Sequence, residues 1–280
     1  MPAETADLTR KDYDLIKELV YANSGINLGD QKMQLVRSRL GKLVRQGGFR
    51  SFREYYNHVK RDSSGKEIGS LLDAISTNTT HLFRETKHFN LLRDIVMRWA
   101  QDKTWKSTNR VLRIWCAASS SGEEPHSIAM VVHDALRGHP EIEPKILASD
   151  ISTQMLAKAK QALYEPHRLG TVPPQFKNRY FRKVIHDGKP VVQLVPELRQ
   201  LITFTRFNLM KPSFPFRFGF HIIFCRNVMI YFDKPTQETL VKKLAGQLHR
   251  GGYLLIGHSE SLNNLEHDLT YAEPTVYRKL

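Results

Sequence analysis

The stretch Trp115-Cys-Ala-Ala-Ser-Ser-Ser-Gly-Glu-Glu-Pro125 decides the fold of this 280-residue chain. Its apolar beginning predicts a β-strand, its run of small residues predicts a turn, and its acidic, proline-marked end predicts the first turn of a helix. Small side chains let the backbone approach a ligand closely, and a strand, a turn and a helix in this order form the entry of a nucleotide-type pocket. The stretch therefore predicts an α/β domain that binds a nucleotide-like ligand.

A polar segment, Ser76-Thr-Asn-Thr-Thr-His-Leu-Phe-Arg84-Glu85, lies about thirty residues before this stretch. It is too rich in polar side chains for a core, and it lacks turn glycines. We interpret it as a loop laid across the ligand, with Arg84 offering its planar guanidinium to a carboxylate. An ordinary linker between two domains fits the same pattern equally well.

From Arg110 onward, apolar strand-like runs alternate with helical patterns. Alternation of this kind predicts a mostly parallel sheet with helices on both faces. Residues 271–280 fit an additional antiparallel strand at the sheet edge. The predicted strands cover residues 111–117, 145–149, 221–225 and 253–257, and the predicted helices cover residues 123–138, 152–164 and 236–250, the last one ended by Gly251-Gly252.

Residues 165–206 interrupt the alternation. Three short β-type runs, 181–185, 191–195 and 201–205, are separated by Asp187-Gly188 and Pro196-Glu197. We interpret this interval as a small antiparallel insertion of three strands within a domain that covers residues 75–280.

Residues 1–74 carry helical patterns only and predict a separate helical domain. Thr9 with Asp12, and Ser51 with Glu54, have the spacing of capping boxes at helix starts. A helix predicted over residues 31–46 repeats its apolar positions every three or four residues, at Met33, Val36, Leu40 and Leu43.

The same helix is strongly basic and contains no acid among its charged positions. A solvated helix face usually mixes both signs of charge, so we favour a docking surface for an acidic partner over a plain solvated face. Its cations are Lys32, Arg37, Arg39, Lys42 and Arg45.

The composition supports a cytoplasmic protein with an acidic partner. Hydrophobic residues make up 41% and charged residues 25%, and the net charge is +14. Such an excess favours nucleic acid, an anionic membrane face or an acidic protein surface. Cys116 and Cys225 lie in apolar runs and are expected to be reduced, and no run is apolar and long enough to cross a bilayer.

Polar residues at the ends of the predicted strands are the candidates for ligand binding. Asp150 stands where parallel α/β folds place an acid for ribose hydroxyls, although it fits a helix N-cap as well, as does Ser152. Arg226, Asn227 and Tyr231 follow the strand at 221–225, with Tyr231 also compatible with the core. The histidines show no metal-ligand spacing, so no metal is expected.

Six segments, in order along nearly the whole chain, resemble the chemotaxis receptor glutamate methyltransferases, the CheR family. They are residues 76–85, 115–130, 148–151, 207–209, 224–233 and 251–260. The resemblance implies a helical N-terminal domain and a Rossmann-like methyltransferase domain with an inserted antiparallel β-subdomain. It implies S-adenosylmethionine as cofactor, with S-adenosylhomocysteine as product.

Residue roles follow from the resemblance motif by motif. Arg84 and Tyr231 would lie nearest the transferred methyl group, and the basic helix would engage the cytoplasmic helical bundle of a chemoreceptor. The enzyme would act as a monomer, without nucleic acid and without inserting into the membrane. The cofactor would contact Asn78, Thr80, Arg84, Glu124, Asp150, Asn208, Leu209, Arg226 and Asn227.

The chain departs from the family pattern in three places. The family often has a cysteine where Ser119 or Ser120 stands and a tyrosine at His126, and neither change removes an essential group. Some members bind a pentapeptide at the receptor C-terminus through a glycine-rich loop of the β-subdomain. Here that loop, residues 184–190, is short and has one glycine, which predicts that methylation does not depend on a pentapeptide.

Two other functions stay open at this point. A nucleic-acid methyltransferase would suit the charge, but Arg226-Asn-Val-Met differs from the Asn-Pro-Pro-aromatic turn with which many base methylating enzymes grip a flipped base. A receptor-binding module without turnover would keep the fold, although Arg84, Asp150 and Tyr231 argue for an active enzyme.

Overall fold

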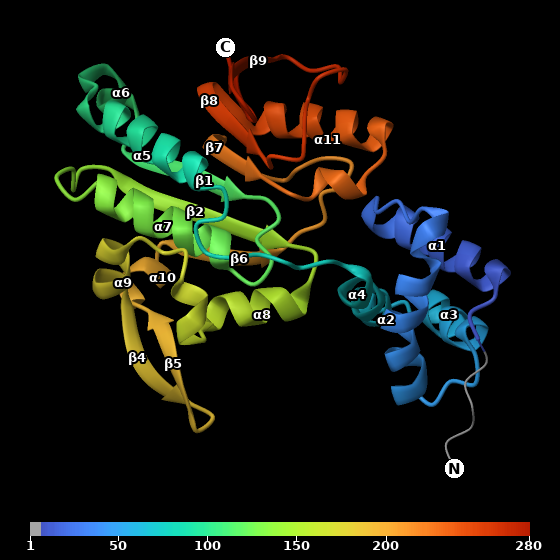
Figure 1. The fold of residues 1–280 in the computed structure, drawn as a ribbon. Coiled ribbons are helices and arrows are strands. Elements are labelled where there is room, and N and C mark those ends of the chain that lie inside the picture. Colours follow the sequence, from blue (N-terminus) through green and yellow to red (C-terminus); the bar gives the residue numbers. More distant parts are fainter. Residues whose placement is uncertain (1–6) are drawn as a thin grey trace.

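The computed structural model describes residues 7–280, and it consists of a helical domain and a larger α/β domain joined by an extended segment (Figure 1). The expected structure of residues 1–6 lies outside the described residues. None of the helices in the described part of the chain is long and apolar enough to cross a bilayer.

Both predicted capping residues begin helices of the small domain. The side chain of Thr9 accepts a hydrogen bond from Asp12 N, and that of Ser51 accepts one from Glu54 N. The second helix is amphipathic as predicted: Val36 and Leu40 are buried, and Met33 and Leu43 pack at the edge of the same core. The helices are α1 (Arg10–Ser24), α2 (Met33–Gln46), α3 (Phe52–Arg61) and α4 (Lys66–Ile75), with a 3-10 turn η1 (Asp30–Lys32) before α2.

The large domain is built on a seven-stranded sheet in the order β6-β2-β1-β7-β8-β10-β9. The first five strands in this order pair in parallel, and β10 adds to β8 in the antiparallel direction. The predicted doubly covered parallel sheet is therefore present. The strands are β1 (Val111–Cys116), β2 (Glu143–Asp150), β6 (Ile202–Arg206), β7 (Phe220–Cys225), β8 (Leu248–Ile256), β9 (Leu269–Glu273) and β10 (Val276–Lys279).

Two apolar cores cover the two faces of this sheet. One contains the buried sides of α5 and α7 against Ile114 and Phe224, and the other contains α11 against Trp115 and Ile223. Neighbouring residues of β1 and β7 thus point to opposite cores, as the alternation of a strand requires. The helices are α5 (Thr86–Gln101), α6 (Lys103–Thr108), α7 (Glu123–Ala135), α8 (Thr153–Gln161) and α11 (Lys234–Gln247).

The antiparallel insertion exists, but one of its predicted strands was assigned to the wrong sheet. The small sheet has the order β3-β5-β4, and residues 202–206 instead form β6, which pairs in parallel with β2 from Ile146↔Ile202 to Asp150↔Arg206. A short β-type run does not reveal which sheet it joins. The insertion comprises β3 (Leu163–Tyr164), η2 (Pro166–Leu169), α9 (Pro174–Tyr180), β4 (Phe181–His186), β5 (Lys189–Leu194) and α10 (Pro196–Arg199).

The boundary predicted at Gly251-Gly252 was also wrong. Helix α11 ends at Gln247, and β8 runs from Leu248 straight through both glycines. A Cβ on Gly252 would lie 2.9 Å from the carbonyl oxygen of His221, so this glycine permits close approach of β7 rather than ending a helix. At the C-terminus two strands, β9 and β10, form where a single edge strand was expected.

Candidate active site

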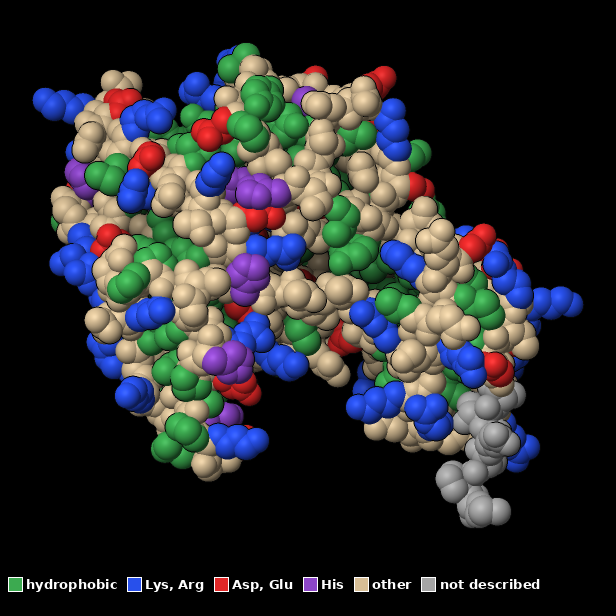
Figure 2. All heavy atoms as spheres, viewed as in Figure 1, with side chains coloured by type: hydrophobic (Ala, Val, Ile, Leu, Met, Phe, Trp, Pro, Cys, Tyr) green, Lys and Arg blue, Asp and Glu red, His purple; other side chains and the backbone are tan. Residues whose placement is uncertain are grey.

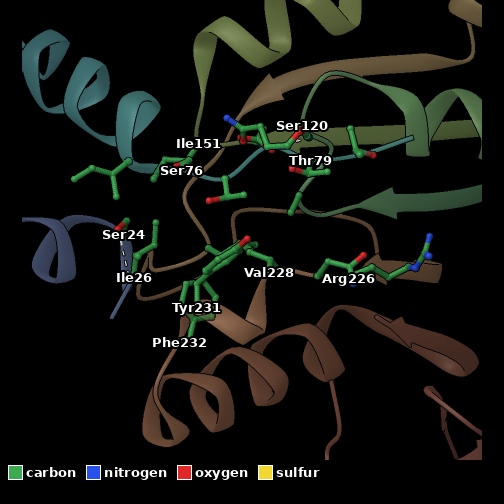
Figure 3. A pocket seen from close by; sticks show the side chains of 18 of the residues that line it. Ser24, Ile26, Ser76, Thr79, Ser120, Ile151, Arg226, Val228, Tyr231 and Phe232 are labelled. Atoms are coloured by element: carbon green, nitrogen blue, oxygen red, sulfur yellow. Dashed lines mark hydrogen bonds between the residues drawn. The ribbon is translucent and has the colours of Figure 1, made fainter. Parts of the chain in front are cut away.

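A cavity opens at the carboxyl ends of β1, β2 and β7, on the side where the helical domain lies (Figure 3). The strand order changes direction between β1 and β7, and such a switch point is where open α/β sheets bind ligands. All ten residues predicted to bind cofactor or act in transfer line this cavity: Asn78, Thr80, Arg84, Glu124, Asp150, Asn208, Leu209, Arg226, Asn227 and Tyr231.

The small-residue loop after β1 brings its backbone close to Asp150. Gly122 has a φ of 100°, and a Cβ there would lie 2.9 Å from Ala159 of α8 and from the His126 ring. Only glycine lets this turn fit against α8. The turn places Ser120 so that its N–H donates to the Asp150 carboxylate at 2.8 Å.

Asp150 is held by two backbone amides and retains acceptor capacity. One oxygen accepts from Ser120 N at 2.8 Å, and the other accepts from Ser152 N at 2.9 Å. The alternative role as helix N-cap belongs to Ser152, whose side chain accepts from Met155 N. Burial raises the pKa of the Asp150 carboxyl. Each carboxylate oxygen has a second lone pair, so Asp150 is able to accept the hydroxyls of a ribose.

Arg226 links the cavity wall to two carboxylates. Its Nη1 lies 2.6 Å from Glu124 Oε2, and its Nη2 lies 2.8 Å from Glu85 Oε2 and donates to the carbonyl oxygen of Arg84 at 2.7 Å. Its side chain is fully buried. Arg226 therefore fixes the relative positions of Arg84, Glu85 and Glu124 at the cavity wall.

Arg84 and Tyr231 approach the cavity from different elements. Arg84 is half-buried, and its Nη1 donates to Thr79 O at 3.1 Å within the polar segment. In Figure 3 Thr79 and Ser120 lie on one side of the cavity, and Tyr231 and Val228 lie on the other. The polar segment thus lines the cavity, as the loop interpretation predicted, besides joining the two domains.

Glu260 is a site residue that the sequence analysis did not single out. Its buried carboxylate accepts hydrogen bonds from the N–H groups of Asn227 at 2.9 Å, Val228 at 2.9 Å, Met229 at 2.7 Å and Gly257 at 2.6 Å. Asn227 has a φ of 57°, so the turn after β7 needs such support. Its position in the sequence could have identified it, because Glu260 follows the last parallel strand just as Asp150 ends β2.

The helical domain is part of the site. Asn208 Nδ2 donates to Asn23 O at 2.7 Å, and Asn27 N donates to Tyr231 O at 2.8 Å. Ser24, the last residue of α1, and Ile26, just after the helix, line the cavity (Figure 3). These contacts hold the end of α1 against the two loops that carry Asn208 and Tyr231.

The five predicted docking cations do not all share one surface. Lys32 lines the cavity, with its Nζ 5.6 Å from the centre of the Tyr231 ring. Arg39 donates to the carbonyl oxygens of Ile75 and Ser76 and therefore ties α2 to the joining segment. Arg37 pairs with Asp7, and Lys42 and Arg45 are exposed.

The set of groups around the cavity fits a nucleoside that carries an amino acid. Asp150 offers carboxylate oxygens that can accept hydroxyl groups, Arg84 offers a guanidinium that can bind a carboxylate, and the apolar side chains of Ile151 and Leu209 line the wall between polar positions.

Two family models together match almost the whole chain. The model described as CheR methyltransferase, all-alpha domain, matches residues 11–76, and the model described as CheR methyltransferase, SAM binding domain, matches residues 78–278.

Curated relatives from three bacteria agree with these matches. A chemotaxis protein methyltransferase of Borreliella burgdorferi is 38% identical over 98% of this chain and 95% of its own length. Chemotaxis protein methyltransferase 2 of Pseudomonas aeruginosa is 39% identical over 96% of this chain and 93% of its own length. A chemotaxis protein methyltransferase of Escherichia coli is 35% identical over 98% of this chain and 92% of its own length.

Proposed function

Because this chain belongs to the CheR methyltransferase family, an S-adenosylmethionine-dependent family of chemotaxis protein methyltransferases, we propose that it methylates glutamate side chains of chemoreceptor cytoplasmic domains. The products would be γ-glutamyl methyl esters. The observation that carries this proposal is the cavity, which joins groups for a nucleoside to Lys32, Arg84 and Tyr231 at the boundary between the domains.

In the proposed arrangement Asp150 binds the ribose hydroxyls, and Arg84 holds a carboxylate at the charged end of the cofactor. Asn78, Thr80, Glu124, Asn208, Leu209, Arg226 and Asn227 complete the cofactor site. S-adenosylmethionine, when bound, supplies an electrophilic methyl group. Arg226 holds Arg84, Glu85 and Glu124 in fixed relative positions through its three hydrogen bonds.

A glutamate substrate needs no general base from the protein. Its carboxyl group has an ordinary pKa of about 4.3 and is ionised at neutral pH, so its oxygen is already a nucleophile. The work of the site is therefore alignment and exclusion of water. We assign this work to Arg84 and to Tyr231, whose backbone is fixed by Asn27 and whose ring shapes the wall opposite Thr79.

The charge distribution supports an acidic receptor as partner. Figure 2 shows Lys and Arg side chains on both sides of the hollow between the helical domain and the β-subdomain. Acidic side chains around the target glutamates would meet Lys32 at the cavity and Lys42 and Arg45 on α2. Arg37 would lie beside these cations. Arg39 would hold α2 in place through its hydrogen bond to the joining segment. A receptor's cytoplasmic bundle as substrate places the enzyme in the cytoplasm, and a monomer suffices for this site.

We further propose that a receptor tail pentapeptide is not required. The β4–β5 hairpin closes with the two-residue turn Asp187-Gly188, in which both residues have positive φ values of 49° and 72°. This is the geometry of a tight type I′ hairpin turn, which has no long loop to hold a peptide.

The test is transfer of labelled methyl from S-adenosylmethionine to receptor-containing membranes, followed by mild alkali. Release of label from receptor protein by alkali supports a carboxyl methyl ester. Label on added RNA or DNA instead of receptor would favour the nucleic-acid methyltransferase, and cofactor binding without any transfer would favour the binding module.

A further inference from the structure

Three possible metal ligands meet beside the cofactor cavity without lining it. They are a carboxylate oxygen of Glu85, Nδ1 or Nε2 of His88 and Nδ1 or Nε2 of His258, and their ligand atoms lie within 4.8 Å of one another. Glu85 precedes α5, His88 lies in its first turn, and His258 follows β8, 173 residues from Glu85. The sequence predicted no metal, because folding alone brings His258 to the pair.

The hydrogen bonds around His88 fix its tautomer. Thr275 Oγ1 donates its single hydrogen to Pro274 O at 2.6 Å, so it accepts from His88 Nε2, which lies 2.8 Å away. A neutral His88 then carries a lone pair on Nδ1. This nitrogen is buried and has no hydrogen-bond partner in residues 7–280.

The Nδ1 atom of His88 lies close to another acceptor. Its Nδ1 lies 3.5 Å from Glu85 Oε2, and His258 Nε2 lies 3.7 Å from the same oxygen. A nitrogen lone pair and a carboxylate oxygen this close together repel each other unless a cation lies between them. Ligands about 2.0–2.2 Å from a tetrahedral zinc ion are about 3.4 Å apart, close to both of these separations.

The charges around the three ligands favour a bound cation. Glu85 and Glu124 share the single positive charge of Arg226, so these three side chains together carry an excess negative charge. The hydrogen bond from His88 to Thr275 is also the kind of outer contact that orients a metal-bound histidine. His258 is half-exposed and gives the ion a path from solvent.

We propose that Glu85 Oε2, His88 Nδ1 and His258 Nε2 bind a divalent zinc-class cation, with a fourth position open to solvent. Glu85 also bonds Arg226 and accepts from His258 N at 3.1 Å, so the ion would hold α5 and the turn after β8 against the wall of the cofactor cavity.

The test is zinc binding to the tag-free, full-length chain after chelator treatment, measured by calorimetry and by metal content after dialysis. We expect one zinc per chain and a higher thermal midpoint in zinc. Cobalt should give the visible absorption of a tetrahedral or five-coordinate site. Absence of stoichiometric binding would overturn the proposal.

Substitutions locate the ion. His258→Ala removes a half-exposed ligand and should lower the zinc affinity at least tenfold and abolish the thermal shift. His167→Ala is the matched control, because His167 is an exposed histidine that lies 3.3 Å from a carboxylate oxygen of Glu165. His88→Gln should also lose the ion. His88 is buried, so His88→Gln alters the core and the variant could fail to fold. In that case His258→Ala decides the question. Undiminished zinc binding in His258→Ala would refute the site.

Discussion

The buried carboxylate of Glu260 accepts a hydrogen bond from the backbone N–H of Asn227 at 2.9 Å and thereby anchors the turn that begins the Asn227–Tyr231 segment. The same carboxylate accepts from Val228, Met229 and Gly257. A Cβ on Gly257 would lie 2.9 Å from Asn227 N, so glycine is needed where the two loops meet. We therefore expect Glu260 to act on the proposed cofactor site through Asn227, as a positioning residue.

Glu260→Gln should weaken both the fold and cofactor binding. An amide oxygen cannot replace two carboxylate oxygens, and the new NH₂ group would face backbone N–H donors. We expect a loss of about 1–3 kcal/mol in the free energy of unfolding. At temperatures where the variant is folded, the affinity for S-adenosylmethionine should fall roughly tenfold. Denaturant unfolding and calorimetry measure the two effects.

The matched control is Glu266→Gln, which removes an exposed carboxylate that pairs with Lys242 at 3.0 Å. It should change neither quantity measurably. Unchanged cofactor affinity in a folded Glu260→Gln variant would show that the turn does not depend on this carboxylate.

Arg84→Ala and Tyr231→Phe should affect different steps, cofactor binding together with transfer in the first variant and transfer alone in the second. Arg84 offers a charged fork to the cavity, so its loss should lower kcat/KM about 100- to 1000-fold and weaken cofactor binding. Tyr231→Phe keeps the ring and removes only the hydroxyl, so it should slow transfer roughly 5- to 10-fold with little change in cofactor affinity. Steady-state kinetics and calorimetry separate the two effects.

Arg182→Ala is the control for Arg84, because Arg182 donates to the carbonyl oxygens of Arg179 and Phe181 in the β-subdomain, outside the cavity. Its kinetics should match those of the unaltered enzyme. Full activity in both Arg84→Ala and Tyr231→Phe would refute the assigned roles.

Reversing two charges on α2 should weaken binding of the receptor without weakening binding of the cofactor. The double variant Lys42→Glu and Arg45→Glu places acids on the surface proposed to meet an acidic bundle, so KM for receptor should rise roughly tenfold at low salt. The difference should shrink as salt increases, because exposed charges are screened. Cofactor affinity should be unchanged.

The double variant Arg93→Glu and Arg98→Glu on α5 is the control, since both arginines are exposed in the α/β domain and the net charge changes by the same amount. An equal rise of KM in this control would mean that the overall charge, and not α2, attracts the receptor.

Removal of the last residues of a receptor should not slow its methylation. The tight Asp187-Gly188 turn leaves no glycine-rich loop to bind a tail. Initial rates on receptors with and without the tail should agree within error. Tight binding of a tail peptide to the enzyme, measured by calorimetry, would contradict this expectation.

The local patterns predicted most of the elements, because capping residues and periodic apolar positions act over short distances. Thr9 and Ser51 cap helices as expected, and the acid at the end of β2 lies in the cavity. The pairing of strands that are distant in the sequence was harder to predict. Residues 202–206 have the composition of a strand, but only their register with β2 decides which sheet they join.

The roles of several site residues depend on long-range contacts that no local pattern displays. Glu260 accepts from amides 30 to 33 residues away as well as from that of Gly257, and His258 N donates to Glu85, 173 residues away in the chain. Arg39 belongs to a basic stripe by sequence, yet it bonds the segment that joins the domains. In each case a long-range contact determines the role of a residue whose type alone is ambiguous.

The most direct test of the account is to locate the methyl group on a purified receptor cytoplasmic fragment by mass spectrometry after incubation with the enzyme and S-adenosylmethionine. We predict that each modified glutamate side chain gains one methyl group, which mild alkali removes and which forms far more slowly when Arg84→Ala replaces the unaltered enzyme. Methyl groups on other side chains, or none on the receptor while cofactor is bound, would contradict glutamate methylation at this cavity.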